Sequence, residues 1–107
     1  MTHSVLIIDD EIRFCDSLEF LLNAEGYQVD IVNSGEQAFR FLQQHAYSVA
    51  LVDINLPDIN GNHIAARIGN EHPETAVIML TGNATVDNAV ESLRHGVYDY
   101  LRKPCSP

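Results

Sequence analysis

Four charged residues and one threonine each follow a short apolar run in this chain, and together they could form a cation-binding site. They are Asp9, Asp10, Asp53, Thr81 and Lys103. If the runs are neighbouring parallel strands, all five side chains gather at one carboxyl edge, where open α/β sheets bind ligands. Clustered carboxylates repel one another unless they hold a cation, and a ligand set made only of oxygen suits Mg²⁺.

The elements that would position these residues alternate along the chain. Apolar runs and amphipathic segments repeat every ~20–28 residues, the length of a βα unit. Two runs have mixed polarity and are expected at the sheet edges, whereas the other three are continuously apolar and are expected to be buried on both faces. The predicted strands are Ser4–Ile8, Val49–Val52 and Ala76–Leu80 in the interior, and Gln28–Val32 and Tyr98–Arg102 at the edges.

Four segments between the runs have the apolar periodicity of helices with one buried face. Ser34 is a suitable N-cap for the second, and Gly26 and Gly96 supply stops after the first and the fourth. Cys15 falls on the core side of the first helix. The predicted helices cover residues 12–25, 35–45, 61–71 and 85–95.

Strand–helix alternation predicts an α/β fold with a parallel sheet and helices on both faces. Five strands with both edges assigned fit the flavodoxin-like, doubly wound order 2-1-3-4-5, which places strands one and three side by side. Residues 1–107 are expected to form one domain that lacks its fifth helix, since the chain stops at Pro107. The uncovered apolar surface beside the first helix would lower stability or favour a homodimer.

Composition narrows the class of protein. The 107 residues are 46% hydrophobic and 20% charged, which suits one small folded domain. A net charge of −9 with only six Lys and Arg residues argues against nonspecific nucleic-acid binding. No apolar run reaches the length of a membrane span. Acids interrupt the first 20 residues, so no signal peptide is expected, and Cys15 and Cys105 form no close motif. A cytoplasmic location is the expectation.

Five short motifs in this order and spacing resemble the receiver domain of two-component response regulators, the CheY-like family. The resemblance covers the chain from Val5 to Pro104. It implies that a histidine kinase or phosphotransfer protein donates a phosphoryl group to an aspartate, and that the domain changes shape and partner binding. The motifs are Ile8-Asp9-Asp10-Glu11, the segment from Val52 to Asp58, Gly61, Leu80-Thr81-Gly82, and the segment from Tyr98 to Pro104.

The resemblance also implies roles for single residues. Asp53 would be the phosphoacceptor, and Asp9 and Asp10 would hold Mg²⁺ with Asp53. The backbone carbonyl of Asn55 would complete the protein ligands, leaving its side chain to face the phosphoryl group. Lys103 would contact a phosphoryl oxygen with its ammonium group.

Further implied roles concern the conformational switch and its lifetime. Thr81 would reach a phosphoryl oxygen, and the ring of Tyr100 would then swing inward. Gly82 would form a tight turn, and Asn83, with Asn55, would tune the phosphoryl lifetime. The peptide bond before Pro104 would be cis, which X–Pro bonds tolerate at modest cost.

Each residue also has an ordinary explanation. Asp53 could be an exposed loop carboxylate, and Asp9 and Asp10 could complement the dipole of the first helix. Tyr100 fits an edge-strand aromatic, and Lys103 a solvated surface charge.

Two other functions use the same pattern. One is a Mg²⁺-dependent phosphohydrolase of the haloacid dehalogenase type, although Asp53-Ile54-Asn55 lacks that family's second acid and follows the third strand. The other is a pseudo-receiver that binds proteins without being phosphorylated.

Overall fold

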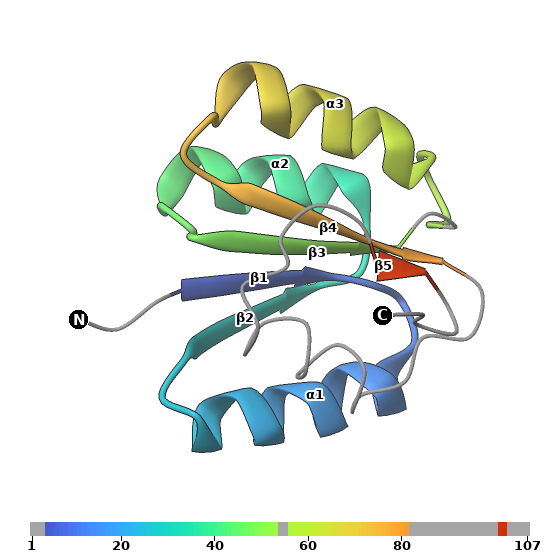
Figure 1. Cartoon of the computed structure of the whole chain (residues 1–107). Helices are drawn as coiled ribbons and strands as arrows, with labels where there is room; N and C mark the ends of the chain where they lie inside the picture. The colour runs from blue at the N-terminus through green and yellow to red at the C-terminus, as the bar shows by residue number, and fades with distance from the viewer. Residues whose placement is uncertain (1–3, 54–55, 82–100, 103–107) are drawn as a thin grey trace.

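A twisted parallel sheet forms the centre of the computed structural model, which describes residues 4–53, 56–81 and 101–102, the side chains of 81, 101 and 102 excepted (Figure 1). The strand order is β2-β1-β3-β4-β5. This confirms the predicted α/β fold and sheet order. The strands are β1 (Ser4–Ile8), β2 (Gln28–Val32), β3 (Val49–Asp53), β4 (Ala76–Thr81) and β5 (Leu101–Arg102).

In the described part of the chain, three helices cover the sheet, with α1 on one face and α2 and α3 on the other (Figure 1). They are α1 (Ile12–Ala24), α2 (Gly35–Gln44) and α3 (Gly61–Glu71). The fourth predicted helix, residues 85–95, lies outside the described residues, as do residues 98–100 of the last predicted strand. Among the described residues, no helix has both the length and the apolar character that crossing a membrane requires.

Alternate residues of β1 serve two separate cores. Val5 and Ile7 pack with Leu18 and Leu22 of α1, whereas Leu6 and Ile8 pack on the side of α2 and α3. The side chains of these four residues are fully buried, whereas Ser4 at the start of the strand is only partly buried. Each buried aliphatic side chain contributes about 1.5–3 kcal/mol, which explains the apolar run from Val5 to Ile8.

The ends of the helices follow local signals in the sequence. The Ser34 hydroxyl accepts a hydrogen bond from the Gln37 amide at 3.2 Å, as its predicted N-cap role requires. Gly26 follows α1 with φ of +94°, a conformation that glycine adopts readily. The Asn60 side chain caps α3 by accepting from the Asn62 amide at 2.8 Å.

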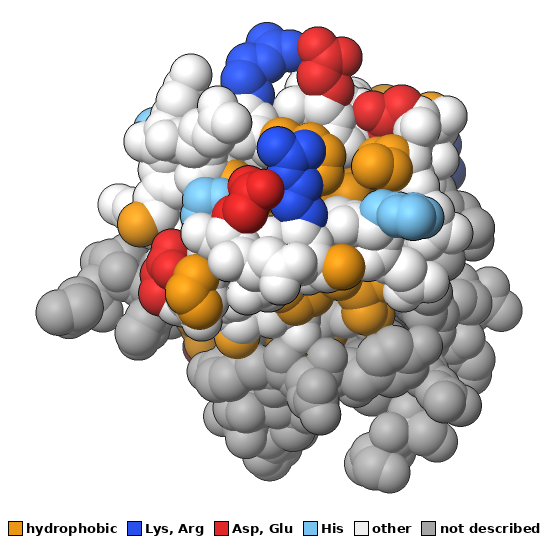
Figure 2. Space-filling view, turned by 90° about the horizontal axis from the view of Figure 1, so that it is seen from above, with side chains coloured by type: hydrophobic (Ala, Val, Ile, Leu, Met, Phe, Trp, Pro, Cys, Tyr) orange, Lys and Arg blue, Asp and Glu red, His pale blue; other side chains and the backbone are white. Residues whose placement is uncertain are grey.

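The outer face of α2 and α3 carries basic and acidic side chains beside one another (Figure 2). Arg40 pairs with Glu36 at 3.3 Å, and Arg67 pairs with Glu71 at 3.0 Å, each one helical turn apart. The Arg67 guanidinium also lies 4.1 Å from the centre of the Phe39 ring, which joins α3 to α2.

The edge strand β2 is only partly covered, as its mixed polarity predicted. Asp30 of this strand accepts a hydrogen bond from the Tyr47 hydroxyl at 2.6 Å. Burial is the main cause that raises the pKa of Tyr47, and the hydrogen bond to Asp30 is the second cause. The bond ties the edge strand to the segment that leads into β3.

Candidate functional site

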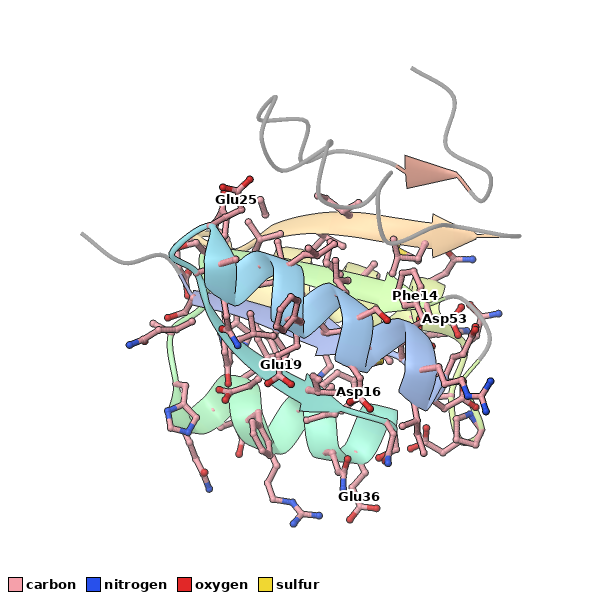
Figure 3. The ribbon with its side chains drawn as sticks, turned by 90° about the horizontal axis from the view of Figure 1, so that it is seen from below. Phe14, Asp16, Glu19, Glu25, Glu36 and Asp53 are labelled. Atoms are coloured by element: carbon pink, nitrogen blue, oxygen red, sulfur yellow. The ribbon has the colours of Figure 1, made fainter. Side chains whose placement is uncertain are left out.

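Three aspartates meet at the carboxyl edge of the two central strands. Ile8 of β1 is in register with Val52 of β3, so Asp9 and Asp53 are the next residues along their strands. Carboxylate oxygens of Asp9, Asp10 and Asp53 all lie within 4.8 Å of one another. Figure 3 shows Asp53 at the end of the sheet where α1 begins.

The three carboxylates differ in exposure. Asp9 is 2% exposed and Asp53 is 8% exposed, whereas Asp10 is open to solvent. The Asp9 carboxylate accepts a hydrogen bond from the Glu11 amide at 2.9 Å, just before α1 begins. The Asp9 amide donates to the carbonyl of Val32 at 3.0 Å. These two bonds fix Asp9 between β2 and the residue that precedes α1.

Asp53 is held by the sheet itself. It is the last residue of β3, and its Cα is in register with that of Leu80 in β4. β3 lies between β1 and β4, and its pairing with β1 ends at Val52, one residue before Asp53. The carboxylate therefore belongs to a strand end held by the sheet, and it lies together with those of Asp9 and Asp10.

The electrostatics of the cluster favour a bound cation. Two unit charges about 4 Å apart repel by about 1 kcal/mol in water and about 4 kcal/mol at the effective dielectric constant near a protein surface. Here three carboxylates lie within 4.8 Å of one another, two of them largely removed from water. A ligand set made only of carboxylate oxygens, open to solvent on one side, fits a hard divalent cation such as Mg²⁺.

The remaining predicted site residues are only partly covered by the structure. Thr81 is the last residue of β4, and its backbone is in register with Arg102 of β5. Thr81 therefore ends β4 at the same edge as the aspartates, and Lys103 is the next residue in the sequence after Arg102. Outside the described residues lie Asn55, Gly82, Asn83, Tyr100, Lys103 and Pro104.

One polar residue near the site had no role predicted from the sequence. The Asp58 carboxylate accepts hydrogen bonds from the amides of Gly35, at 2.9 Å, and Glu36, at 3.1 Å. The bond from the Gly35 amide is the main cause that lowers the pKa of Asp58. An acid suits a helix N-terminus, but the partners are 23 and 22 residues away, so no local pattern indicates this contact.

Cys15 is buried on the core side of α1, as predicted, and it contacts Asp9 of the cluster. Its side chain is 2% exposed, and its thiol donates to the Asp9 carbonyl at 3.5 Å. Burial, reinforced by the negative charges of Asp9 and Asp16, raises the thiol pKa from 9.0 to about 12. The thiol therefore stays neutral at physiological pH.

We expect native Cys15 to resist alkylation. At pH 8 the rise in pKa from 9.0 to about 12 reduces the thiolate about a thousandfold. Because the folded pKa is the higher one, the stability linked to this thiol is complete below pH 9 and is lost as pH rises toward 12. Iodoacetamide labelling followed by peptide mapping, in buffer and in urea, measures the protection. Equal rates in both solvents would contradict the buried, neutral thiol.

Comparison with known proteins decides the family. A sequence model of the response regulator receiver domain matches residues 5–107. The chain belongs to the response regulator receiver domain family. This receiver domain is thus a signalling domain of two-component systems, and the haloacid dehalogenase alternative is set aside.

Relatives of the receiver domain agree in sequence and in structure. It is 34% identical to the transcriptional regulatory protein SrrA of Staphylococcus aureus (strain NCTC 8325 / PS 47) over 107 residues, which is all of this chain and 44% of SrrA. The receiver domain therefore spans less than half the length of this relative.

Two solved structures resemble it over the whole chain. One is a CheY-like response regulator receiver domain protein from Methanospirillum hungatei JF-1, with a TM-score of 0.80, 33% identity and 86% of that chain covered. The other is the BeF3-activated DrrB receiver domain, with a TM-score of 0.75, 27% identity and 89% of that chain covered.

Proposed function

We propose that this receiver domain accepts a phosphoryl group on Asp53, donated by a histidine kinase or a phosphotransfer protein. The observation that carries the proposal is the group of three carboxylates within 4.8 Å of one another at the carboxyl edge of β1 and β3. Asp53 is the nucleophile in this assignment because it ends the central strand and leads directly into a loop. The similar receiver domain of DrrB is known in a BeF3-activated form, which supports this use of the site.

The chemical step forms one bond and breaks one. A carboxylate oxygen of Asp53 attacks phosphorus and forms an acyl phosphate, while the bond between phosphorus and the donor's leaving group breaks. Asp9, Asp10 and Asp53 would hold Mg²⁺, with the Asn55 backbone carbonyl as a further ligand. Bound Mg²⁺ would offset the negative charge of the incoming phosphoryl group.

Other residues would use the phosphoryl group once it has arrived. Lys103 would meet a phosphoryl oxygen with its positive charge, and the Thr81 hydroxyl would reach another. The movement of Thr81 would let the ring of Tyr100 turn inward, which shifts the domain between two packings. The order of the five motifs and the shared strand edge support these roles.

The output of the switch would come from a further domain or a separate protein. SrrA is named a transcriptional regulatory protein, so transcription is the output that this relative supports. We propose that the phosphorylated receiver acts through a further domain or a separate protein, and that a homodimer and a cytoplasmic location are consistent with that role.

Acetyl phosphate with Mg²⁺ tests the proposal directly. We expect the intact mass of the wild-type protein to rise by one phosphoryl group, and we expect EDTA to prevent the rise. Beryllofluoride should compete with the label. Rapid repeated hydrolysis of a phosphate ester would contradict the single transfer to Asp53 that we propose. A folded protein that takes no label would favour the protein-binding pseudo-receiver.

Mg²⁺ should also stabilise the domain against unfolding. A cation that binds only the folded state at a hundredfold excess over its Kd adds about 2.7 kcal/mol. Asp10→Asn should lose most of this gain, yet be at least as stable as the wild type in EDTA, because it relieves repulsion in the cluster. Urea unfolding with and without Mg²⁺ measures both effects.

The matched control for this measurement is Asp16→Asn, which removes an exposed acid of α1 outside the cluster. It should keep the full response to Mg²⁺. An equal Mg²⁺ response in Asp10→Asn and Asp16→Asn would argue against the metal site.

A further inference from the structure

Asp58, in the loop between β3 and α3, is hydrogen-bonded to the beginning of α2. Both carboxylate oxygens of Asp58 are used: Oδ1 accepts from the Gly35 amide at 2.9 Å, and Oδ2 accepts from the Glu36 amide at 3.1 Å. These amides belong to the first turn of α2, where backbone N–H groups have no partner within the helix. A charged acceptor makes stronger hydrogen bonds than a neutral one. The contact therefore joins two segments that are distant in sequence.

Two neighbours of Asp58 reinforce the attachment. The Ile59 side chain lies directly over Gly35, where a Cβ atom on residue 35 would overlap its Cγ2 methyl group. Leu56 and Ile59 are partly buried against the core on the side of α2 and α3. Asn60 then caps α3. The described part of the loop is thus held at successive positions.

Helix capping alone does not account for Asp58. The first turn of α2 already has a local cap, since the Ser34 hydroxyl accepts from the Gln37 amide. Gln37 in turn accepts from the Asn33 amide at 3.0 Å. What Asp58 adds is a connection to the loop that begins at Asp53. The same helix end therefore has one cap that serves only the helix and one that also fixes the loop.

We propose that Asp58 is a positioning residue for the Asp53 site. Residues 54–57 connect two fixed points, the strand end at Asp53, paired with β4, and the attachment of Asp58 to α2. Leu56 and Ile59 also pack against the core on this side, so the attachment holds the described end of the connection, residues 56–58, in place. Small displacements of reacting groups lower rates strongly, so this constraint should speed phosphoryl transfer. The proposal rests on the proposed function of Asp53.

The test compares Asp58→Ala with Ser34→Ala. Both substitutions remove a cap from the first turn of α2, but only Asp58→Ala releases the loop. At a temperature well below both melting points, we expect Asp58→Ala to be labelled by acetyl phosphate about fivefold to tenfold more slowly than wild type. Its apparent Mg²⁺ affinity, measured by the shift in unfolding midpoint, should also fall. Ser34→Ala should keep the wild-type rate and Mg²⁺ affinity.

The conservative variant Asp58→Asn adds a second check. Its amide oxygen retains one acceptor at the same place, so the labelling rate should lie between those of Asp58→Ala and the wild type. Amide hydrogen exchange should rise in residues 56–60 of Asp58→Ala and stay unchanged there in Ser34→Ala.

The outcomes separate the two proposals. If the wild type is labelled normally and Asp58→Ala matches Ser34→Ala in rate and Mg²⁺ affinity, the positioning role is wrong while the function of Asp53 stands. A wild type that takes no label overturns the proposed function and the positioning role with it. Slow labelling of Asp58→Ala alone, with partial recovery in Asp58→Asn, supports the positioning role.

Discussion

Asp53→Asn is expected to abolish labelling by acetyl phosphate, with a loss of more than about 10³-fold in rate. The amide has almost the same shape as the carboxylate but lacks its nucleophilic oxygen. The fold should persist, because asparagine fills nearly the same volume and the strand pairing of Asp53 uses only its backbone. Replacing one of three clustered carboxylates also removes repulsion, so stability in EDTA should be equal to or above that of the wild type.

Asp16→Asn is the control for this variant. It makes the same chemical change at an exposed position of α1 and should leave labelling unchanged. Intact mass spectrometry measures the stoichiometry, and release of the label by hydroxylamine identifies an acyl phosphate. Stoichiometric labelling that survives in Asp53→Asn would mean that another residue is the nucleophile.

Gly35→Ala is expected to destabilise the domain by about 1–3 kcal/mol, the usual cost of forcing an extra methyl group into a packed site. The added Cβ would overlap the Ile59 Cγ2 methyl group, and it would approach Ile64 Cδ1 to 3.3 Å. Ile64 is fully buried, so it has little freedom to move aside. Ile59 would be displaced, and the loop that carries Asp58 would move with it.

Gly69→Ala makes the same chemical change but is expected to raise the free energy of unfolding instead of lowering it. Gly69 lies inside α3, and a Cβ atom there would meet nothing within 4 Å. Alanine is favoured over glycine within a helix by about 0.8–1.0 kcal/mol, so this variant should be more stable than the wild type. Urea unfolding of both variants measures the pair. A neutral or stabilising Gly35→Ala would show that Ile59 adjusts at no cost.

Much of the fold follows from patterns that the sequence carries locally. Continuous apolar runs identify strands buried on both faces, and β1 shows why: its alternate residues face two cores. Mixed polarity places β2 at an edge, and Gly26 and Ser34 mark helix ends. The observed strands β3 and β4 each extend one residue beyond the prediction, to Asp53 and Thr81, because ladder pairing continues past the apolar run.

The meeting of Asp9, Asp10 and Asp53 could also be predicted from the sequence. Parallel strands end at the same edge, so the strand order alone brings the residues that follow β1 and β3 together. The distances and the unequal burial required the tertiary structure, since side-chain packing decides how far each carboxylate is removed from water.

What the sequence determined by itself is therefore the order of the elements and the edge at which the acids collect. Only the tertiary structure revealed that Asp58 binds the first turn of α2 and that Ile59 lies over Gly35. The physical reason is the range of the interactions. Periodicity and capping act within a few residues, whereas these contacts join segments over 20 residues apart, and their partners meet only after the sheet and helices have packed.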